Sequence, residues 1–190
     1  KHFTGSVIFS RYPIIDSGLI RYPRPSLPEA LMHADIRIGN DTVRVYTTHL
    51  QSLQLNDEDY KKINDIREGE QDIVDNSRHI FSKLKTGITY RKAQADIIQQ
   101  VMGDSPYPVL FCADMNDIPN SYTYYTVKGN MQDAFLKKGF GIGRTFTSLS
   151  PTLRIDYILA DRDFQIDQFD RVIRRYSDHY MLVADMELRK

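Results

Sequence analysis

Pro108-Val-Leu-Phe-Cys-Ala-Asp-Met-Asn-Asp-Ile-Pro119 joins a short apolar run to a cluster of polar side chains. The apolar half, Val109 to Ala113, is short and bounded by proline, which is typical of a strand that is buried on both faces. Polar side chains that directly follow a buried strand lie where α/β sheets place their ligands. This stretch therefore predicts a central strand whose end carries part of a functional site.

Asp114 and Asn116 are the polar side chains of this stretch with the clearest chemical use. They are two residues apart, so on an extended backbone they point to the same side. A carboxylate beside an amide suits a metal ion, a phosphate oxygen or an attacking water. The alternative is a strand followed by an ordinary turn, with Asp117 capping a helix after Pro119, and for Asp117 we prefer this interpretation.

The composition is that of a globular protein without a strong net charge. The chain has 190 residues, interpreted as one domain over residues 1–190, of which 41% are hydrophobic and 26% charged. Its 25 basic and 25 acidic residues give a formal net charge of zero. Such a chain is not suited to coating a nucleic acid through charge alone, although it could grip a phosphate locally.

Cysteine content and hydropathy leave the compartment open. Cys112 is the single cysteine and lies inside the buried run, so no internal disulfide can form and we expect it to pack as a small apolar side chain. No apolar run approaches the length of a membrane span, and no signal peptide is present. We expect a soluble domain of unknown localisation.

Alternating apolar residues and turn residues predict further strands. Gly39-Asn40-Asp41 separates two alternating segments, which indicates an antiparallel hairpin. Besides the central strand, strands are predicted over Ser6–Ser10, Ile14–Ile20, Leu31–Ile38, Val43–Leu50, Arg154–Ala160, Phe164–Ile173 and Met181–Leu188. The proline-rich segment Tyr22–Pro28 must be a loop.

Helical periodicity occupies the segments between these strands. The charged segment Leu53–Gly87 predicts one long or two shorter helices with a solvated face. Separate helices are predicted over Tyr90–Met102, over Ser121–Val127 with Asn120 as its N-cap, and over Met131–Lys138. Strands and helices together predict an α/β (α+β) fold.

Other polar side chains lie at strand ends or within strands. His49 ends one strand, and Asp156 lies in an otherwise apolar strand, where Arg154 is the candidate salt-bridge partner. Asp178 precedes His179, and a carboxylate beside an imidazole can orient it and raise its basicity. Six side chains are thus expected to gather at one end of a sheet: His49, Asp114, Asn116, Asp156, Asp178 and His179.

Several kinds of site are not supported by the motifs. The sequence has no Gly-x-Ser-x-Gly elbow, no phosphate-binding Gly-Lys-Ser/Thr loop and no Gly-x-Gly-x-x-Gly fingerprint. One cysteine and scattered histidines make a zinc site a poor interpretation. Oxygen ligands with two histidines favour Mg²⁺ or Mn²⁺ acting on a phosphate ester.

Five stretches of this chain, taken in order, resemble a known family. They are Gly5-Ser-Val-Ile-Phe-Ser-Arg-Tyr-Pro-Ile14, Thr48-His-Leu50, Ala113-Asp-Met-Asn-Asp-Ile-Pro119, Arg154-Ile-Asp-Tyr-Ile158 and Ser177-Asp-His179. The set resembles the endonuclease/exonuclease/phosphatase family, which includes deoxyribonuclease I-like nucleases, inositol polyphosphate 5-phosphatases and sphingomyelinases. The resemblance implies a four-layer α/β sandwich and a divalent-metal phosphoesterase site that uses Mg²⁺ or Mn²⁺.

The resemblance also implies roles for the matching residues. His49 would donate to a phosphoryl oxygen, and Asp156 would belong to the network that tunes the site. Asp114 and Asn116 would position the nucleophilic water, the phosphate or a second metal, and Asp178 also lies close to the metal in this family. His179, polarised by Asp178, would act as base or as phosphate stabiliser. Arg91 could reach a phosphate of the substrate or could simply be a surface charge.

Two departures from the family pattern affect these expectations. The family usually has Gly where Ala113 stands, and we expect the extra methyl group to be accommodated. The Asn and the metal-binding Glu that the family carries in two strands before Gly5 have no counterpart here. We therefore expect an N-terminally incomplete domain, with weakened metal binding and with exposed apolar sheet edges that could pair with another copy or with the missing part of the domain.

The leading interpretation is a metal-dependent hydrolase that cleaves a phosphodiester or phosphomonoester by in-line attack of water. The alternative is a catalytically inactive binding or scaffold version of the same fold. A DNA-repair nuclease is a third reading, which the neutral charge makes less attractive than a small phosphoester or lipid head group. Substrate choice is expected to depend on Tyr22–Pro28 and on Leu53–Gly87.

Overall fold

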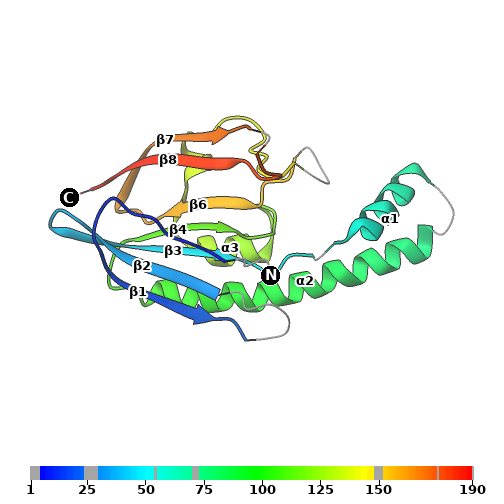
Figure 1. Ribbon diagram of the computed structural model, residues 1–190, viewed down its shortest axis with the longest axis horizontal. Coiled ribbons are helices and arrows are strands. Elements are labelled where there is room, and N and C mark those ends of the chain that lie inside the picture. Colours follow the sequence, from blue (N-terminus) through cyan, green and yellow to red (C-terminus); the bar gives the residue numbers. More distant parts are fainter. Residues whose placement is uncertain are drawn as a thin grey trace.

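The computed structural model describes residues 5–23, 30–53, 55–69, 73–147, 152–174 and 176–189, which form two β-sheets and a set of helices (Figure 1). The larger sheet has the strand order β1-β2-β3-β4-β6-β5, and β7 pairs with β8 in the smaller sheet. The strands are β1 (Ile14–Arg21), β2 (Ala30–Ile38), β3 (Asp41–His49), β4 (Val109–Asp114), β5 (Gln132–Asp133), β6 (Asp156–Ala160), β7 (Phe164–Val172) and β8 (Met181–Leu188). The helices are α1 (Asp57–Glu68), α2 (Ile73–Gly103), α3 (Tyr122–Lys128) and α4 (Ala134–Lys138).

Strand direction in the larger sheet follows from the connections. β2 and β3 form the predicted antiparallel hairpin, with Gly39 in the left-handed region at its turn (φ 64°). β3 and β4 are parallel, and the crossover that parallel strands need is supplied by α1 and α2. β6 then runs antiparallel to β4, so it begins where β3 and β4 end.

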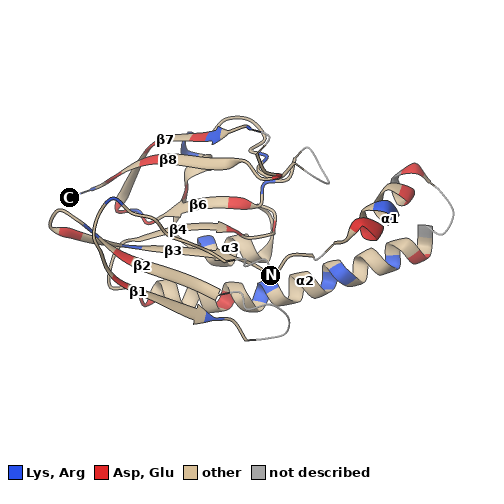
Figure 2. Cartoon of the chain, in the orientation of Figure 1, with Lys and Arg blue, Asp and Glu red and all other residues tan. Residues whose placement is uncertain are grey.

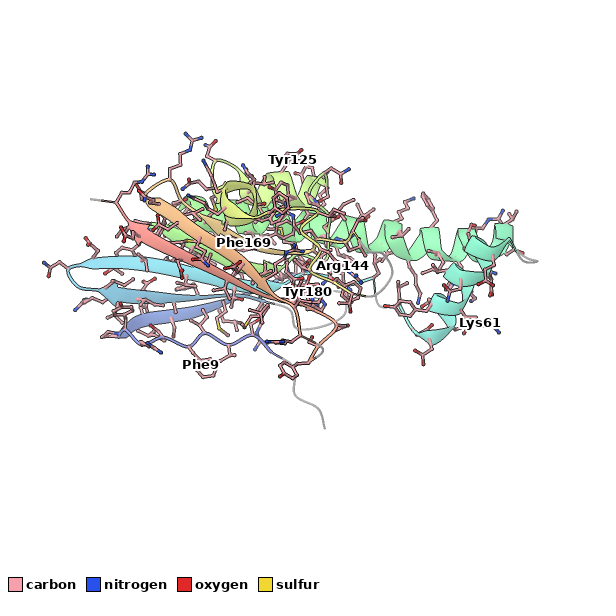
Figure 3. All side chains as sticks on the ribbon, turned by 90° about the horizontal axis from the view of Figure 1, so that it is seen from above. Phe9, Lys61, Tyr125, Arg144, Phe169 and Tyr180 are labelled. Carbon is pink, nitrogen blue, oxygen red and sulfur yellow. The ribbon has the colours of Figure 1, made fainter. Side chains whose placement is uncertain are left out.

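Two apolar cores lie on the two faces of the larger sheet. Alternate residues of β4 divide between them: Phe111 packs among the residues that face α2 and α3, and Leu110 packs on the side of β7 and β8. Phe169 of β7, labelled in Figure 3, belongs to this second core. The predicted α/β class with stacked sheets is confirmed. The described residues form three of the four expected layers, because Gln165 and Asp167 on the outer face of β7 are exposed.

One predicted strand is wrong. Residues 5–10 form no strand, although their side chains alternate as the sequence predicts. Ile8 packs against the second core, whereas Val7 and Phe9 are 64% and 88% exposed. Figure 3 shows Phe9 on the outside of the body. The periodicity was therefore local, and no described strand pairs with this segment.

The segment from Leu53 forms a helical arm, α1 with the first half of α2, that projects beyond the sheets (Figure 1). Basic and acidic residues are interspersed along it (Figure 2), and Lys61 lies on it far from the body (Figure 3). Asn56 caps α1, and the buried carboxylate of Asp59 binds His79 and Lys83, which ties α1 to α2. No described helix is long and apolar enough to cross a membrane.

The separate helix predicted over Tyr90–Met102 is instead the second half of α2, which runs for 31 residues without a break. Gly87 lies inside the helix and allows it to pass close to the chain that follows β3. A Cβ atom there would lie 2.9 Å from Cδ2 of Leu53 and 3.0 Å from Nη1 of Arg91. The glycine therefore serves a close approach and not a helix end.

The two short helices begin later than predicted. Ser121, and not Asn120, caps α3, since its side chain accepts from the main-chain N–H of Tyr124. The helix predicted from Met131 begins at Ala134, because Gln132 and Asp133 first pair with β6 as strand β5. The predicted loop Tyr22–Pro28 begins as expected at Tyr22, and its residues 24–28 lie outside the described residues.

Candidate active site

Three polar side chains form one row across the ends of three neighbouring strands. His49 is the register partner of Asp114, and Asp114 is the register partner of Asp156. Alternation directs all three toward the gap between the two sheets, on the side of Leu110 and Ile158. Strand pairing alone therefore brings these three residues together, although the first, His49, and the last, Asp156, are 107 positions apart in sequence.

His179 joins this row from the segment before β8. Its Nδ1 lies 3.0 and 3.1 Å from the two carboxylate oxygens of Asp156. Its Nε2 lies 3.9 Å from Oδ2 of Asp114, and Nε2 of His49 lies 3.6 Å from the same oxygen. The side chains of Asp114 and Asp156 are only 15% and 17% exposed, whereas that of His49 is 51% exposed, so the row is open to solvent from one side.

Asn116 reaches the row through a turn and not through an extended backbone. The strand ends at Asp114, whose Oδ1 accepts the main-chain N–H of Asn116 at 2.7 Å. Asn116 has a φ of 49°, a left-handed conformation that Asn tolerates better than most residues. Its Nδ2 donates to the carbonyl oxygen of Leu50 at 2.9 Å and contacts Nε2 of His49 at 3.2 Å. The expected grouping of Asp114 and Asn116 is therefore present, by a different local geometry.

Asp178 lies apart from the row. The carboxylate that hydrogen-bonds to His179 is Asp156, and not Asp178 as the sequence had suggested. The Asp178 carboxylate is exposed, contacts Ser177 Oγ at 3.3 Å, and contributes less than Asp156 and Asp114 to raising the pKa of His179. The main-chain oxygen of Asp178 accepts from the N–H and the hydroxyl of Thr147. Sequence neighbours point in different directions here, and the structure brings together five of the six expected side chains.

Thr145 is a supporting residue that the sequence gave no reason to select. Its buried hydroxyl oxygen accepts the main-chain N–H groups of Ile155 and Asp156 at 3.0 and 3.1 Å. Its carbonyl oxygen accepts the N–H of Tyr180 at 2.8 Å. Arg144 and Tyr180, labelled in Figure 3, mark the two segments that meet here. One residue thus holds the backbone beside Asp156 and beside His179.

Arg91 is neither a surface charge nor in contact with solvent. It is 3% exposed, and its guanidinium donates to Oδ2 of Asp117 and to the carbonyl oxygen of Gln51, each at 3.0 Å. Asp117 also accepts from the hydroxyl of Thr123, so it does not cap α3 as expected. These contacts brace the loops that carry His49 and Asn116, and the burial does not favour direct contact between Arg91 and a substrate.

Arg154 does not pair with Asp156, although it lies two residues away on the same strand segment. Its Nη1 donates to Oδ2 of buried Asp133 at 2.8 Å. The hydroxyl of Tyr124 donates to the same oxygen at 2.8 Å, and the guanidinium stacks on the Tyr157 ring at 4.7 Å. Asp156 is left to His179 alone among the described basic residues.

The surroundings shift the two central ionisable groups in a direction that suits catalysis. Burial, and then the nearby charge of Asp156, raise the pKa of Asp114 to about 6. The hydrogen bond that His179 donates to the Asp156 carboxylate raises the pKa of His179. The site therefore holds one carboxyl group, that of Asp114, that resists ionisation, and an imidazole made more basic by its partner.

Asp114, Asp156 and His179 could together hold a metal ion. Each offers one ligand atom, and these atoms lie within 4.8 Å of one another. No described Lys or Arg forms an ion pair with either carboxylate. Two crowded carboxylates without a compensating cation fit a hard divalent ion such as Mg²⁺ or Mn²⁺. Of the expected metal ligands, Asp114 belongs to this group and Asp178 does not, while Asn116 lies beside it, in contact with Asp114 and His49.

Comparison with known proteins identifies the relatives of this chain. The profile described as the Endonuclease/Exonuclease/phosphatase family matches residues 1–179. Among solved structures, humanised D. rerio TDP2 shares 16% identity at a TM-score of 0.66, over 93% of this chain and 68% of that one. No curated protein sequence shows a significant match.

Two further solved structures show the same likeness of fold. A mannosyl-6-phosphatase from Bacteroides thetaiotaomicron shares 14% identity at a TM-score of 0.62, over 93% of this chain and 67% of that one. The human Nocturnin catalytic domain shares 13% identity at 0.61, over 94% and 60%. This chain thus spans 60% to 68% of the length of these three structures. With the profile match over nearly its whole length, the chain belongs to the Endonuclease/Exonuclease/phosphatase family.

Proposed function

We propose that this chain carries the catalytic row of a divalent-metal-dependent phosphoesterase, which hydrolyses a phosphodiester or phosphomonoester by in-line attack of water. One observation supports the proposal most: strand register alone aligns His49, Asp114 and Asp156, and the separate segment before β8 adds His179 to that row. Structural ion pairs are normally saturated by opposite charge, whereas this row has an excess of carboxylate.

His179 and Asp156 are assigned the proton transfer. If Nδ1 carries its proton toward Asp156, Nε2 is the acceptor and faces Asp114 across 3.9 Å. A water molecule that lies to one side of these two atoms can hydrogen-bond to both of them. The carboxylate also stabilises the imidazolium that forms when His179 takes the proton of the attacking water.

Asp114, Asn116 and His49 are assigned to orientation of the reacting groups. Asp114 is held by the main-chain N–H of Asn116, so one of its oxygens is fixed and the other faces the two imidazoles. Asn116 contacts His49 and the Leu50 carbonyl, which fixes its amide at the edge of the row. A protonated His49 would donate to a phosphoryl oxygen as negative charge develops there.

Asp114 and Asp156 are the residues assigned to a divalent ion, which leaves Nε2 of the neighbouring His179 to accept the proton. When bound, Mg²⁺ or Mn²⁺ would supply Lewis-acid stabilisation of charge on the phosphoryl oxygens. Its charge would also offset the repulsion between the two carboxylates, which adds to burial in raising the pKa of Asp114. Asp178 lies next to His179 and is exposed, so it remains a candidate additional ligand after local movement.

The substrate is proposed only as a phosphate ester. Family membership and the names of the neighbours support this class, since they include a phosphatase and a TDP2 structure complexed with a single-strand DNA product. None of the named neighbours shares more than 16% sequence identity with this chain, so none of them supports a particular substrate. The neutral charge supports a small phosphoester no less than a nucleic acid.

The second candidate is a binding protein that retains the fold without turnover. It is favoured by how few metal-ligating side chains converge, since there are three among the described residues. Nothing in the comparisons supports the self-association expected from the sequence. The two candidates differ in one respect that can be measured, which is hydrolysis.

The test uses bis-p-nitrophenyl phosphate and p-nitrophenyl phosphate with Mg²⁺ or Mn²⁺, and again with EDTA, beside His179→Ala. The enzyme proposal predicts metal-dependent release of nitrophenol that EDTA stops and His179→Ala reduces by roughly 10²–10⁴-fold. A longer version of the protein, extended at the N-terminus, is assayed in parallel. If neither version turns over either ester, the enzyme proposal is wrong for these substrates and the binding interpretation gains.

A further inference from the structure

A second concave site lies at the end of the larger sheet opposite the catalytic row. Asp156 begins β6 beside Asp114, and Ala160 ends it beside Leu110 and Gln132. Four strand residues at about 3.3 Å each separate the two ends, so this region is on the order of 15 Å from the row. It lies toward the C-terminus in Figure 1, away from the arm.

A cavity of ≈ 750 Å³ occupies this position, between the ends of α3 and α4, the turn after β6 and the last residues after β8. It adjoins a smaller cavity of ≈ 460 Å³ that shares Lys128 and Arg162 as lining residues. Ligand sites in proteins commonly have volumes of about 300–1,000 Å³. The cavity is large enough for a ligand of nucleotide size and is more than a single inorganic phosphate would fill.

Four cationic side chains line this cavity, in a chain whose total charge is zero. They are Lys128, Lys137, Arg162 and Arg189. None of the four forms an ion pair within the described part of the chain. The protein contacts of Lys128 and Arg162 are long ones to the neutral carbonyl oxygens of Gly129 and Asn130, at 3.4 and 3.3 Å. Their charges are therefore not neutralised by the protein.

Two of the three acidic residues nearby are engaged by other groups. Asp133 lines the cavity, but its Oδ2 is bound by Arg154 and Tyr124, and its Oδ1 accepts the N–H of Leu136. Asp161 accepts the N–H of Val109 with its carboxylate. Asp163 lines only the smaller cavity, where it is exposed.

Helix termini account for part of the pattern. Lys128 and Lys137 lie in the last turns of α3 and α4, where cations are favourable beside the carbonyl ends of a helix. Arg162 and Arg189 lie in a strand turn and after a strand, so no helix end explains them. Two arginines and two lysines from four separate segments line one hollow, and an anion bound there would offset their mutual repulsion.

We propose that this cavity binds an anion carrying two or more phosphate groups, at a site separate from the catalytic row. Guanidinium groups match the geometry of phosphate oxygens, and ammonium groups add charge without fixed direction. The amide side chain of Gln132 is held by the carbonyl oxygens of Asp161 and Phe164, so this wall is fixed before a ligand arrives. The inference does not depend on hydrolysis at the row.

The experiment is calorimetric titration of inorganic tripolyphosphate into the chain in EDTA at low salt. The proposal predicts one binding site per chain, an affinity that falls as salt rises, and a loss of at least tenfold in Arg162→Gln/Arg189→Gln. Both arginines are exposed, and a thermal melt of the variant shows whether it is folded. Lys137→Gln, which leaves both arginines in place, is predicted to weaken binding less.

Two control variants separate this cavity from the rest of the molecule. Lys61→Gln/Lys85→Gln removes the same charge from exposed positions of the arm and is predicted to bind as well as the wild type. His179→Ala tests whether the probe instead occupies the catalytic row and is predicted to have no effect. Absence of binding, equal weakening by the arm pair, or loss of binding in His179→Ala would each overturn the proposal.

A competition experiment distinguishes the two sources of such phosphates. A single-stranded oligothymidylate that displaces tripolyphosphate, and that loses affinity in the Arg162/Arg189 variant, would identify a nucleic-acid backbone as the ligand. Failure of the oligonucleotide to compete, with tripolyphosphate binding intact, would assign the cavity to a small phosphorylated molecule.

Discussion

Arg154 and Asp156 are two residues apart, yet the charge of Arg154 is balanced by its surroundings and that of Asp156 is not. Arg154 is 4% exposed, and its charge is matched by Asp133, which also accepts from Tyr124. Asp156 lies beside a second carboxylate, Asp114, and its described basic partner is an imidazole. A buried charge with a full set of partners is typical of structure, whereas an unbalanced pair of carboxylates indicates a place for a ligand.

This difference accounts for the error in the sequence-based expectation. Arg154 and Asp156 fall on the same face of an ideal strand, which favoured a salt bridge between them. The strand begins only at Asp156, so the backbone at Arg154 is not bound by that alternation. Its guanidinium turns instead to the side of Tyr124 and Tyr157, where the aromatic faces and Asp133 receive it.

The largest effect should come from a substitution in the unbalanced cluster, which is the row with the two carboxylates Asp114 and Asp156. The quantity that changes should be the catalytic rate. His179→Ala is expected to lower kcat by roughly 10²–10⁴-fold, because it removes the group assigned to take the proton from water. The thermal midpoint should fall less than the rate, since the side chain is 30% exposed, although the substitution removes its contact with the Phe146 ring and its hydrogen bond to Asp156. Steady-state hydrolysis and a thermal melt on the same preparation separate the two quantities.

The balanced cluster should show the opposite behaviour. Arg154→Met is expected to lower the free energy of unfolding by about 3–5 kcal/mol, because Asp133 is left as a buried charge. Activity per folded molecule should persist at low temperature. The double variant Asp133→Asn/Arg154→Met should recover part of the loss, as it leaves no buried charge. Equal loss in single and double variants, measured by urea unfolding, would contradict this account of the cluster.

Neutralising a carboxylate of the row should stabilise the metal-free protein. The pKa of Asp114 is raised from 3.8 to about 6 in the fold, so folding favours the protonated form. Stability then falls as pH rises from about 4 to 6, and above pH 6 Asp114→Asn should be more stable than wild type by about 2 kcal/mol. Below pH 4 the difference should vanish. Urea unfolding in EDTA at pH 3.5 and pH 7.5 checks the sign.

Thr145 offers the smallest and most specific test. Thr145→Val leaves the N–H groups of Ile155 and Asp156 without their acceptor, at a cost of about 1–3 kcal/mol. We expect kcat to fall by about tenfold with KM unchanged, since a misplacement of Asp156 affects the reacting groups and not general binding. Thr145→Ser should restore both quantities.

Tyr124→Phe is the matched control for this prediction. It also removes a buried hydrogen bond, to Asp133, at a distance from the row. It should lower stability by a similar amount and leave kcat unchanged. If Tyr124→Phe lowers kcat as much as Thr145→Val, the role assigned to Thr145 is merely that of a stabilising residue.

The strands could be predicted from the sequence because their pattern is local. Phe111 and Leu110 alternate between two faces, and the turn at Gly39 needs no distant partner. The continuity of α2 could not be predicted from the sequence, because the reason for a glycine at position 87 is its close approach to Leu53, which is a contact made only in the folded protein. The strand predicted around Val7 is wrong for a related reason, since the alternation of apolar side chains does not reveal whether a neighbouring strand is present to pair with it.

Most residues of the candidate site could be predicted from the sequence, but several of the contacts between them could not. His49, Asp114 and Asp156 lie at strand ends that the sequence predicts, so their grouping follows from sheet register. The pairing of His179 with Asp156 depends on a long-range contact that adjacency to Asp178 concealed. Thr145 carries no distinguishing pattern, because its role is to accept main-chain N–H groups.

Titration of Mn²⁺ into the chain tests the central claim, that the unbalanced carboxylates form a cation site, most directly. Binding is measured for wild type, Asp114→Asn, Asp156→Asn and Arg154→Met, each at a temperature where the variant is folded. The account predicts saturable binding in wild type and Arg154→Met, with affinity at least tenfold weaker in both Asn variants. Equal binding in all four proteins, or none in wild type, would contradict it.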